Sequence, residues 1–135
     1  MKTAKGQLTR RDIQLIEYCQ SHLPITSDIA ATLFYPNRYI AQRRLNTIYH
    51  LKHLKRTERL IVNQPYFYYC DKSDLKNFTF TKLLHDLRVQ EYEIVEFNFD
   101  GQHLNVVVEK DEATFKINTT LQNINQVYKR LALAQ

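Results

Sequence analysis

The chain has 135 residues, of which 44% are hydrophobic, and a formal net charge of +5. This length suits one compact domain or a small module with an appendage, and it excludes a multidomain enzyme. The seven Phe and nine Tyr can fill a core, which excludes a disordered composition. No apolar run approaches the roughly 18 residues that span a bilayer, and residues 1–7 lack the apolar stretch of a signal peptide. We therefore expect a cytoplasmic protein without a membrane partner.

Charge is distributed unevenly along the chain. Residues 1–62 contain 11 Lys and Arg against 4 Asp and Glu, whereas residues 63–135 contain 8 against 10. A basic half joined to an acidic half indicates one end that faces an anion, most often nucleic acid, and another end with a separate purpose. Chance clustering of solvated charges is the alternative.

Helix start and stop signals divide the first half of the chain. Thr9 and Asp12 form a potential capping pair, and Pro24 ends the helix that they begin. A second helix, about two turns long, begins at Thr26. Asn37 can cap a third and longer helix that carries several basic residues. The expected helices cover residues 9–23, 26–34 and 37–54.

Two β-rich runs, over residues 56–62 and 66–70, follow the third predicted helix. They flank Asn63-Gln64-Pro65, so the sequence predicts a hairpin. Three helices followed by a hairpin describe a winged helix, in which the third helix enters the major groove of DNA. We therefore expect an α+β chain: a winged helix-turn-helix DNA-binding domain over residues 1–72, followed by a small mixed α/β extension over residues 73–135.

The extension is expected to hold a helix, three strands and a last helix. Asp111-Glu112 favours the turn between the second and third strands. The last helix begins after Thr119 or Thr120 and carries an apolar stripe. We expect this stripe to pack in part on the preceding strands, and to form a homodimer or a surface for a second protein. The expected elements cover residues 79–92, 93–99, 104–109 and 113–118, and the stripe consists of Leu121, Ile124, Val127, Tyr128 and Leu131.

The third predicted helix has an apolar and a polar side, because successive residues turn by about 100°. The apolar residues are Ile40, Ala41, Leu45, Ile48 and Leu51, and the polar residues are Tyr39, Gln42, Arg43, Asn46, His50 and His53. Arg pairs with guanine and Gln or Asn with adenine, while Tyr and His can reach phosphates. The polar side therefore predicts contact with double-stranded DNA, and an ordinary solvated face is the alternative. With neighbouring basic residues and the hairpin tip, the expected DNA contacts are Arg38, Tyr39, Gln42, Arg43, Asn46, His50, Lys55, Arg59, Asn63 and Gln64.

Arg44 differs from its neighbours, because the helical wheel places it toward the apolar side. A partly buried arginine needs a carboxylate or helix C-terminal carbonyls. We therefore expect a structural role for Arg44, with Asp12, Glu17 or Asp28 as its partner.

The basic residues that follow the third predicted helix are expected to contact phosphates: Lys52, Lys55, Arg56 and Arg59.

Motifs over residues 8–90 resemble the replication-relaxation family of winged-helix proteins. The family is found on plasmids and on conjugative or integrated elements of bacteria, and the resemblance implies DNA binding on such an element through the third helix. Longer members continue into a nuclease-like region, whereas Asp100 and Glu109-Lys110-Asp111 do not give the (D/E)-x-K spacing of its metal sites. The motifs are Leu8-Thr9-x-Arg11-Asp12, Ile16, Ile25-Thr26, Leu33-Phe34, Arg44-Leu45-x-x-Ile48-Tyr49-x-Leu51 and His85-x-Leu87-x-Val89.

Catalytic and metal-binding motifs are not recognisable in the sequence. It lacks a phosphate-cradling Gly-rich loop, GxSxG and HExxH, and Cys19 and Cys70 stand apart without a CxxC. We therefore expect no enzyme, no metal and no cofactor. The leading hypothesis is a sequence-specific DNA-binding protein, acting as a transcriptional regulator or as a replication or mobilisation accessory. An antirepressor or inhibitor that uses the winged helix to bind a protein is the alternative, and recognition of single strands is a third possibility.

Overall fold

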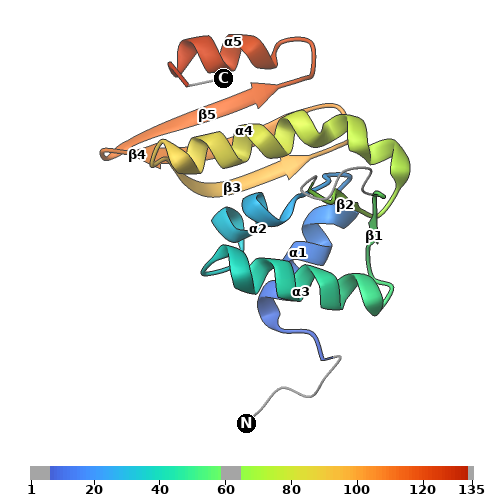
Figure 1. Cartoon of the computed structure of the whole chain (residues 1–135). Helices are drawn as coiled ribbons and strands as arrows, with labels where there is room; N and C mark the ends of the chain where they lie inside the picture. Colours follow the sequence, from blue (N-terminus) through green and yellow to red (C-terminus); the bar gives the residue numbers. More distant parts are fainter. Residues whose placement is uncertain (1–6, 59–64, 134–135) are drawn as a thin grey trace. The chain divides into compact units, whose positions relative to one another are not determined.

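The computed structural model describes residues 7–58 and 65–133 (Figure 1). It is a mixed α+β chain, as predicted, and it divides into two compact units, residues 1–78 and 79–135. The sequence placed the boundary after residue 72, but a short 3-10 helix, η1 (Lys72–Asn77), belongs to the first unit. In the described part of the chain, every helix is too short or too polar to cross a bilayer.

The first unit begins with α1 (Arg10–Gln20) and its capping box. The Asp12 amide donates to Thr9 Oγ1 at 3.2 Å, and the Thr9 amide donates to Asp12 Oδ2 at 2.8 Å. This confirms the predicted cap. The helix ends before Pro24 as expected, but already at Gln20, because His22 turns the chain into the left-handed region with φ at 72°.

Two further helices complete the helical part of this unit, α2 (Ser27–Leu33) and α3 (Arg38–His50). Asn37 caps α3 as predicted, because its Oδ1 accepts the Ile40 amide at 2.9 Å. The prediction that α3 runs to about residue 54 was wrong. Lys52 adopts a left-handed φ of 68°, and the His53 amide bonds back to the Ile48 carbonyl at 3.2 Å, which closes the helix.

A short antiparallel pair follows α3, formed by β1 (Lys55–Arg56) and β2 (Tyr68–Tyr69). The Thr57 amide extends the pairing by donating to the Phe67 carbonyl at 3.0 Å. The described residues thus contain the base of the predicted hairpin, and its tip lies outside them. On its other side β2 pairs with Ile25 through two backbone hydrogen bonds of 3.0 and 2.8 Å, which the sequence did not predict.

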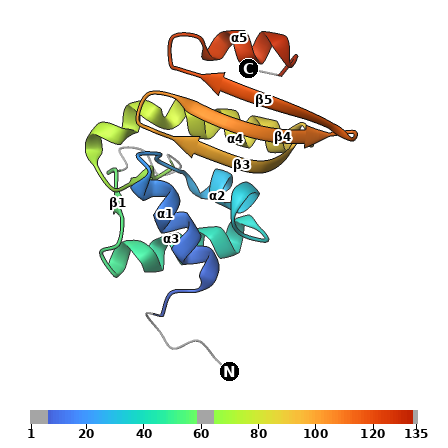
Figure 2. The same ribbon diagram turned by 180° about the vertical axis from the view of Figure 1, so that it is seen from behind.

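The second unit holds a three-stranded antiparallel sheet in the order β3-β4-β5, one face of which is covered by α4 (Figures 1 and 2). Phe80 of α4 packs on Phe99 of β3 with ring centroids 4.9 Å apart. Asp111 and Glu112 join β4 to β5 with φ of 53° and 66°, the backbone that a two-residue hairpin turn needs. The predicted elements are all present, with these bounds: α4 (Phe78–Val89), β3 (Glu93–Phe99), β4 (Leu104–Lys110), β5 (Ala113–Thr119) and α5 (Ile124–Arg130).

Candidate nucleic-acid interface

The two sides of α3 differ sharply in exposure. Ala41, Leu45 and Ile48 have no exposed surface, and they fix the helix against the rest of the unit. The opposite side carries five of the six predicted polar residues, all of them exposed, with 67% of Tyr39 accessible. The sixth, His53, is exposed beyond the end of the helix. Leu51 is an exception to the predicted apolar side, since 37% of it is exposed beyond the end of the helix. The exposed polar residues are Tyr39, Gln42, Arg43, Asn46 and His50.

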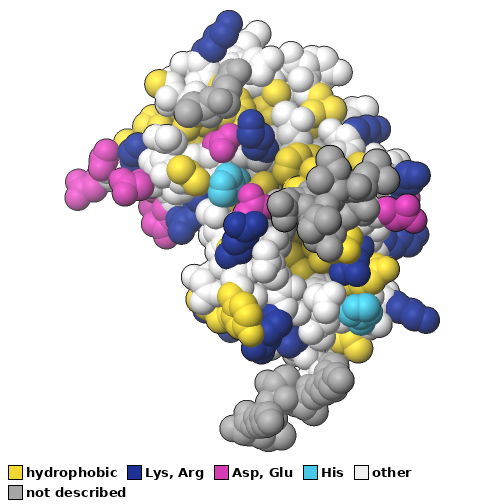
Figure 3. Space-filling model, viewed as in Figure 1, with side chains coloured by type: hydrophobic (Ala, Val, Ile, Leu, Met, Phe, Trp, Pro, Cys, Tyr) yellow, Lys and Arg dark blue, Asp and Glu magenta, His cyan; other side chains and the backbone are white. Residues whose placement is uncertain are grey.

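Positive charge accompanies the polar side of α3. The helix contains three arginines and neither Asp nor Glu. In Figure 3, Lys, Arg and His side chains lie along α3 and at its end. Within the described residues, Arg38 and Arg43 form no salt bridge, so their charges are available to an anionic ligand. Arg43 lies 5.7 Å from the centre of the Tyr39 ring, which lies one helical turn before it.

A shallow hollow of about 540 Å³ lies where α3 ends and β1 begins. Three basic side chains and one histidine contribute to its lining, and the remaining lining residues are neutral. A concave basic surface of this kind suits a phosphate better than an apolar ligand. The lining consists of Tyr49, His50, Lys52, Leu54, Lys55, Arg56 and Tyr69.

Arg56 is fixed between two aromatic rings at this hollow. Its guanidinium carbon lies 3.8 Å from the centre of the Tyr49 ring and 4.1 Å from the centre of the Tyr66 ring. It also donates a hydrogen bond of 3.1 Å from Nη1 to Asn46 Oδ1. Arg56 therefore connects α3 to both sides of the hairpin base. Its charge predicted only phosphate contact, although the tyrosines before and after it in the sequence were a usable signal for cation–π packing.

Arg44 has the predicted structural role, and Asp12 is its partner. Its Nε lies 3.2 and 3.1 Å from the two carboxylate oxygens of Asp12, and its Nη2 donates to Asp12 Oδ2 and, at 3.0 Å, to the Gln7 carbonyl. The Tyr35 hydroxyl donates to the same carboxylate at 2.7 Å. Burial raises the pKa of Asp12, but the hydrogen bonds from Arg44, Thr9 and Tyr35 outweigh burial and hold this pKa below its usual value. This network joins α1 to α3 and fixes the orientation of the polar side.

Three of the predicted DNA contacts fall in the part of the chain that the structure does not describe. Arg59, Asn63 and Gln64 lie outside the described residues. The other seven lie on α3 or, in the case of Lys55, on β1, and all seven are exposed. They are Arg38, Tyr39, Gln42, Arg43, Asn46, His50 and Lys55.

The predicted apolar stripe on the last helix is largely part of the protein core. Ile124, Val127 and Tyr128 are buried, and the Tyr128 hydroxyl donates a 2.6 Å hydrogen bond to Asp86 Oδ2 on α4. Leu131 is half-buried, and only Leu121 is exposed, at 38%. The expected packing within the unit is confirmed for Ile124, Val127 and Tyr128, which leaves Leu121 and the exposed part of Leu131 for a dimer or partner surface.

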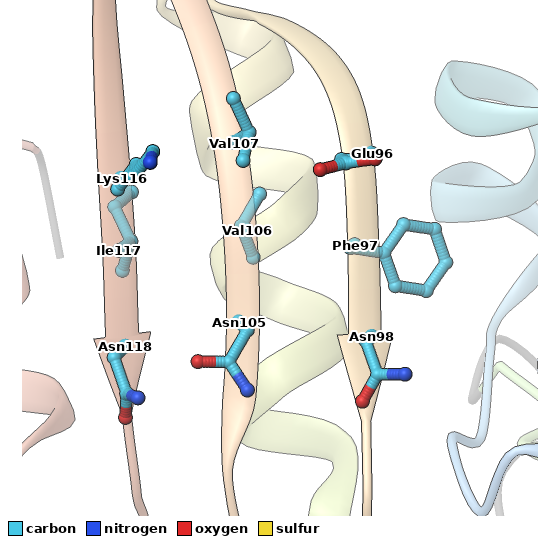
Figure 4. A pocket seen from close by; sticks show the side chains of 9 residues that line it. All are labelled: Glu96, Phe97, Asn98, Asn105, Val106, Val107, Lys116, Ile117 and Asn118. Carbon is cyan, nitrogen blue, oxygen red and sulfur yellow. The ribbon is translucent and has the colours of Figure 1, made fainter.

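The second unit has its own hollow, of about 550 Å³, on the sheet (Figure 4). Asn98, Asn105 and Asn118 stand in register across its three strands. Glu96 and Lys116 flank Val107 in the next row, so the lining carries one charge of each sign. Such a surface offers amide hydrogen bonds and has no pair of carboxylates for acid–base chemistry. Among the described residues, no three His, Cys, Asp or Glu side chains are arranged to hold a metal ion.

Comparisons with protein-family models, with curated proteins and with solved structures find no match for this chain. The resemblance to the replication-relaxation family therefore stays a prediction.

Proposed function

We propose that the first part of the chain is a winged-helix domain that binds double-stranded DNA and reads its sequence with α3. The observation that carries this proposal is the outward side of α3. It presents Gln42, Arg43 and Asn46, side chains that pair with base edges. The opposite side of the helix is anchored in the core by Ala41, Leu45 and Ile48. A rigid helix with one side anchored and one side polar is the geometry that major-groove recognition needs.

The surroundings of α3 support the same function. Lys52 and Lys55 follow the helix at the basic hollow and are exposed, so they can contact phosphates on either side of the groove. The hairpin base adjoins α3 through Arg56, and this contact supports a wing beside a recognition helix.

Duplex DNA fits this surface better than single strands do. Recognition of a single strand needs exposed aromatic faces on which bases can stack. Tyr49 and Tyr66 instead pack against the Arg56 guanidinium, and Tyr68 is only 4% exposed. The aromatic residues of the hairpin base therefore serve the protein's own packing.

The role on a mobile element, as a regulator or as a replication or mobilisation accessory, rests on the family resemblance of residues 8–90 and stays a prediction. Homodimerisation also stays a prediction. Because Ile124, Val127 and Tyr128 are buried within the second unit, a homodimer would have to use a surface beyond these three residues.

Selection of bound sequences from random duplex DNA tests the proposal. We expect enrichment of a defined motif, a preference for the duplex over either single strand, and an affinity that falls steeply with added salt. No enrichment, together with no binding at low salt, would refute it. A stable, salt-insensitive complex with a protein partner under the same conditions would favour the antirepressor or inhibitor alternative.

A further inference from the structure

The hydrogen bond between Arg56 and Asn46 determines which hydrogen-bonding atoms Asn46 can present to a ligand. An arginine side chain has only donors, so the atom of Asn46 that faces Nη1 must be its carbonyl oxygen, as the 3.1 Å contact has it. The Asn46 side-chain amide nitrogen is then turned away from Arg56. Among the described residues it has no hydrogen-bond partner, and the side chain is exposed.

Arg56 cannot easily turn away from this contact. Its guanidinium lies between the Tyr49 and Tyr66 rings at 3.8 and 4.1 Å, and the side chain is only partly exposed. Stacking on two rings limits the rotamers of a long side chain that is otherwise flexible. The orientation of Asn46 is therefore set in advance of any DNA contact.

We propose that Arg56 is a positioning residue that makes Asn46 a reader of guanine. The inference rests on the proposed function, DNA recognition by α3. An asparagine recognises adenine by using its oxygen as acceptor for the N6 amino group and its nitrogen as donor to N7. Here one of the two lone pairs of the oxygen accepts from the Arg56 cation, and the guanidinium N–H groups beside it disfavour the approach of a second donor such as N6. Guanine presents two acceptors, O6 and N7, to the major groove, and both are attracted by the amide nitrogen and by the nearby guanidinium.

The neighbouring base reader on α3 has the same preference. Arg43 lies three residues before Asn46, on the same side of the helix, and is exposed. Its guanidinium also has only donors and pairs most readily with O6 and N7 of guanine. The two residues together predict a guanine-containing step in the recognised sequence.

Selections with the wild-type chain, Asn46→Ala, Arg56→Ala and Tyr66→Leu test this inference. We expect a guanine in the wild-type motif whose preference disappears in Asn46→Ala. In Arg56→Ala the freed amide should prefer adenine at that position, a change of roughly tenfold in relative affinity. Tyr66→Leu removes one stacking ring without changing the net charge, so it should weaken the guanine preference and leave the salt dependence of binding unchanged. It also tests the inference if Arg56→Ala does not fold.

Lys55→Ala is the matched control, because it removes one positive charge at the adjacent position. It should weaken binding to all sequences alike and lower the salt slope by about one, as loss of a phosphate contact does. The same uniform loss in Arg56→Ala, with the guanine preference intact, would overturn the inference and make Arg56 a phosphate ligand.

Failure of the inference can be distinguished from failure of the proposed function. A wild-type motif with adenine at the Asn46-dependent position overturns the inference and supports DNA recognition by α3. No binding to any duplex at low salt overturns both.

Discussion

The ion pair between Arg44 and Asp12 gives the sharpest test of how the first unit holds α3 in place. We consider Arg44→Met, which keeps a long, unbranched side chain of similar reach and removes the charge. The Asp12 side chain has no exposed surface, and the substitution removes its cationic partner. Two of its hydrogen bonds remain, from the Thr9 amide at 2.8 Å and the Tyr35 hydroxyl at 2.7 Å.

The size of the effect follows from burial. Removing one partner of a buried ion pair costs about 3–5 kcal/mol. The Arg44 side chain is 17% exposed, so solvent already screens part of the interaction, and we expect about 3 kcal/mol, the lower end of that range. For a unit of this size, such a loss lowers the melting temperature by roughly 12–24 °C.

Urea titration of wild-type protein, Arg44→Met and Arg43→Met measures this difference. Arg43→Met makes the same chemical change at the next position, where the side chain is exposed and only stacks on Tyr39 at 5.7 Å. It should cost less than about 1 kcal/mol. Equal losses of stability in the two variants would refute the assignment of Arg44 to the structure and of Arg43 to the surface.

The dependence on pH provides a second criterion. The pKa of Asp12 is lowered in the folded protein, so its contribution to stability is complete above the unfolded value, about 3.9, and is lost as the pH falls through the folded pKa. In Arg44→Met, burial dominates and the carboxyl takes up a proton more readily. The stability difference between wild type and Arg44→Met should therefore be largest near neutral pH. It should begin to shrink as the pH falls through the raised pKa of Asp12 in the variant, and vanish below the lowered pKa of Asp12 in the wild type. A difference that stays constant into acid would contradict this.

Three further predictions concern other contacts. Thr9→Ala removes the acceptor of the α1 capping bond and should cost about 1 kcal/mol in urea titration, whereas Thr9→Ser should cost little; equal losses would speak against the cap. Tyr128→Phe removes the 2.6 Å hydrogen bond to Asp86 and should cost about 1–2 kcal/mol, and an unchanged melting temperature would contradict the contact. Burial raises the pKa of both thiols, and Cys19 has no exposed surface while Cys70 is partly exposed. A thiol reagent should therefore modify Cys70 first and Cys19 only after unfolding, and equal rates would argue against the buried position of Cys19.

Local signals in the sequence were sufficient for much of the fold. The caps at Thr9 and Asn37 act through a side chain and a backbone amide only three residues away, so the sequence alone reveals them. The strands of the second unit were predicted to within one residue at each end, because alternation and the Asp111-Glu112 turn are also local features. The partner of Arg44 could be narrowed to three acids, since few acids occur near the helices.

Features that depend on contacts between distant segments could not be predicted. Ile25 pairs with Tyr68, more than forty residues later, and no local pattern marks such a bridge. The end of α3 depends on Lys52 adopting a left-handed backbone that usually favours glycine, so no residue type at this position signals the end of the helix. Arg56 could be assigned to phosphate contact by its charge, but its place between two tyrosines is a property of the folded hairpin.

Binding of duplex DNA by the variant Arg43→Ala/Asn46→Ala tests the central claim most directly. Fluorescence anisotropy at low salt would compare it with wild type and with Arg88→Ala/Asn105→Ala, which removes the same residue types from exposed positions in the second unit. We expect at least a tenfold weaker Kd for the α3 variant on the selected duplex, corresponding to about 1.4 kcal/mol or more, with an unchanged melting temperature. The control variant should bind like wild type. Equal binding by the two double variants would contradict recognition of DNA through α3.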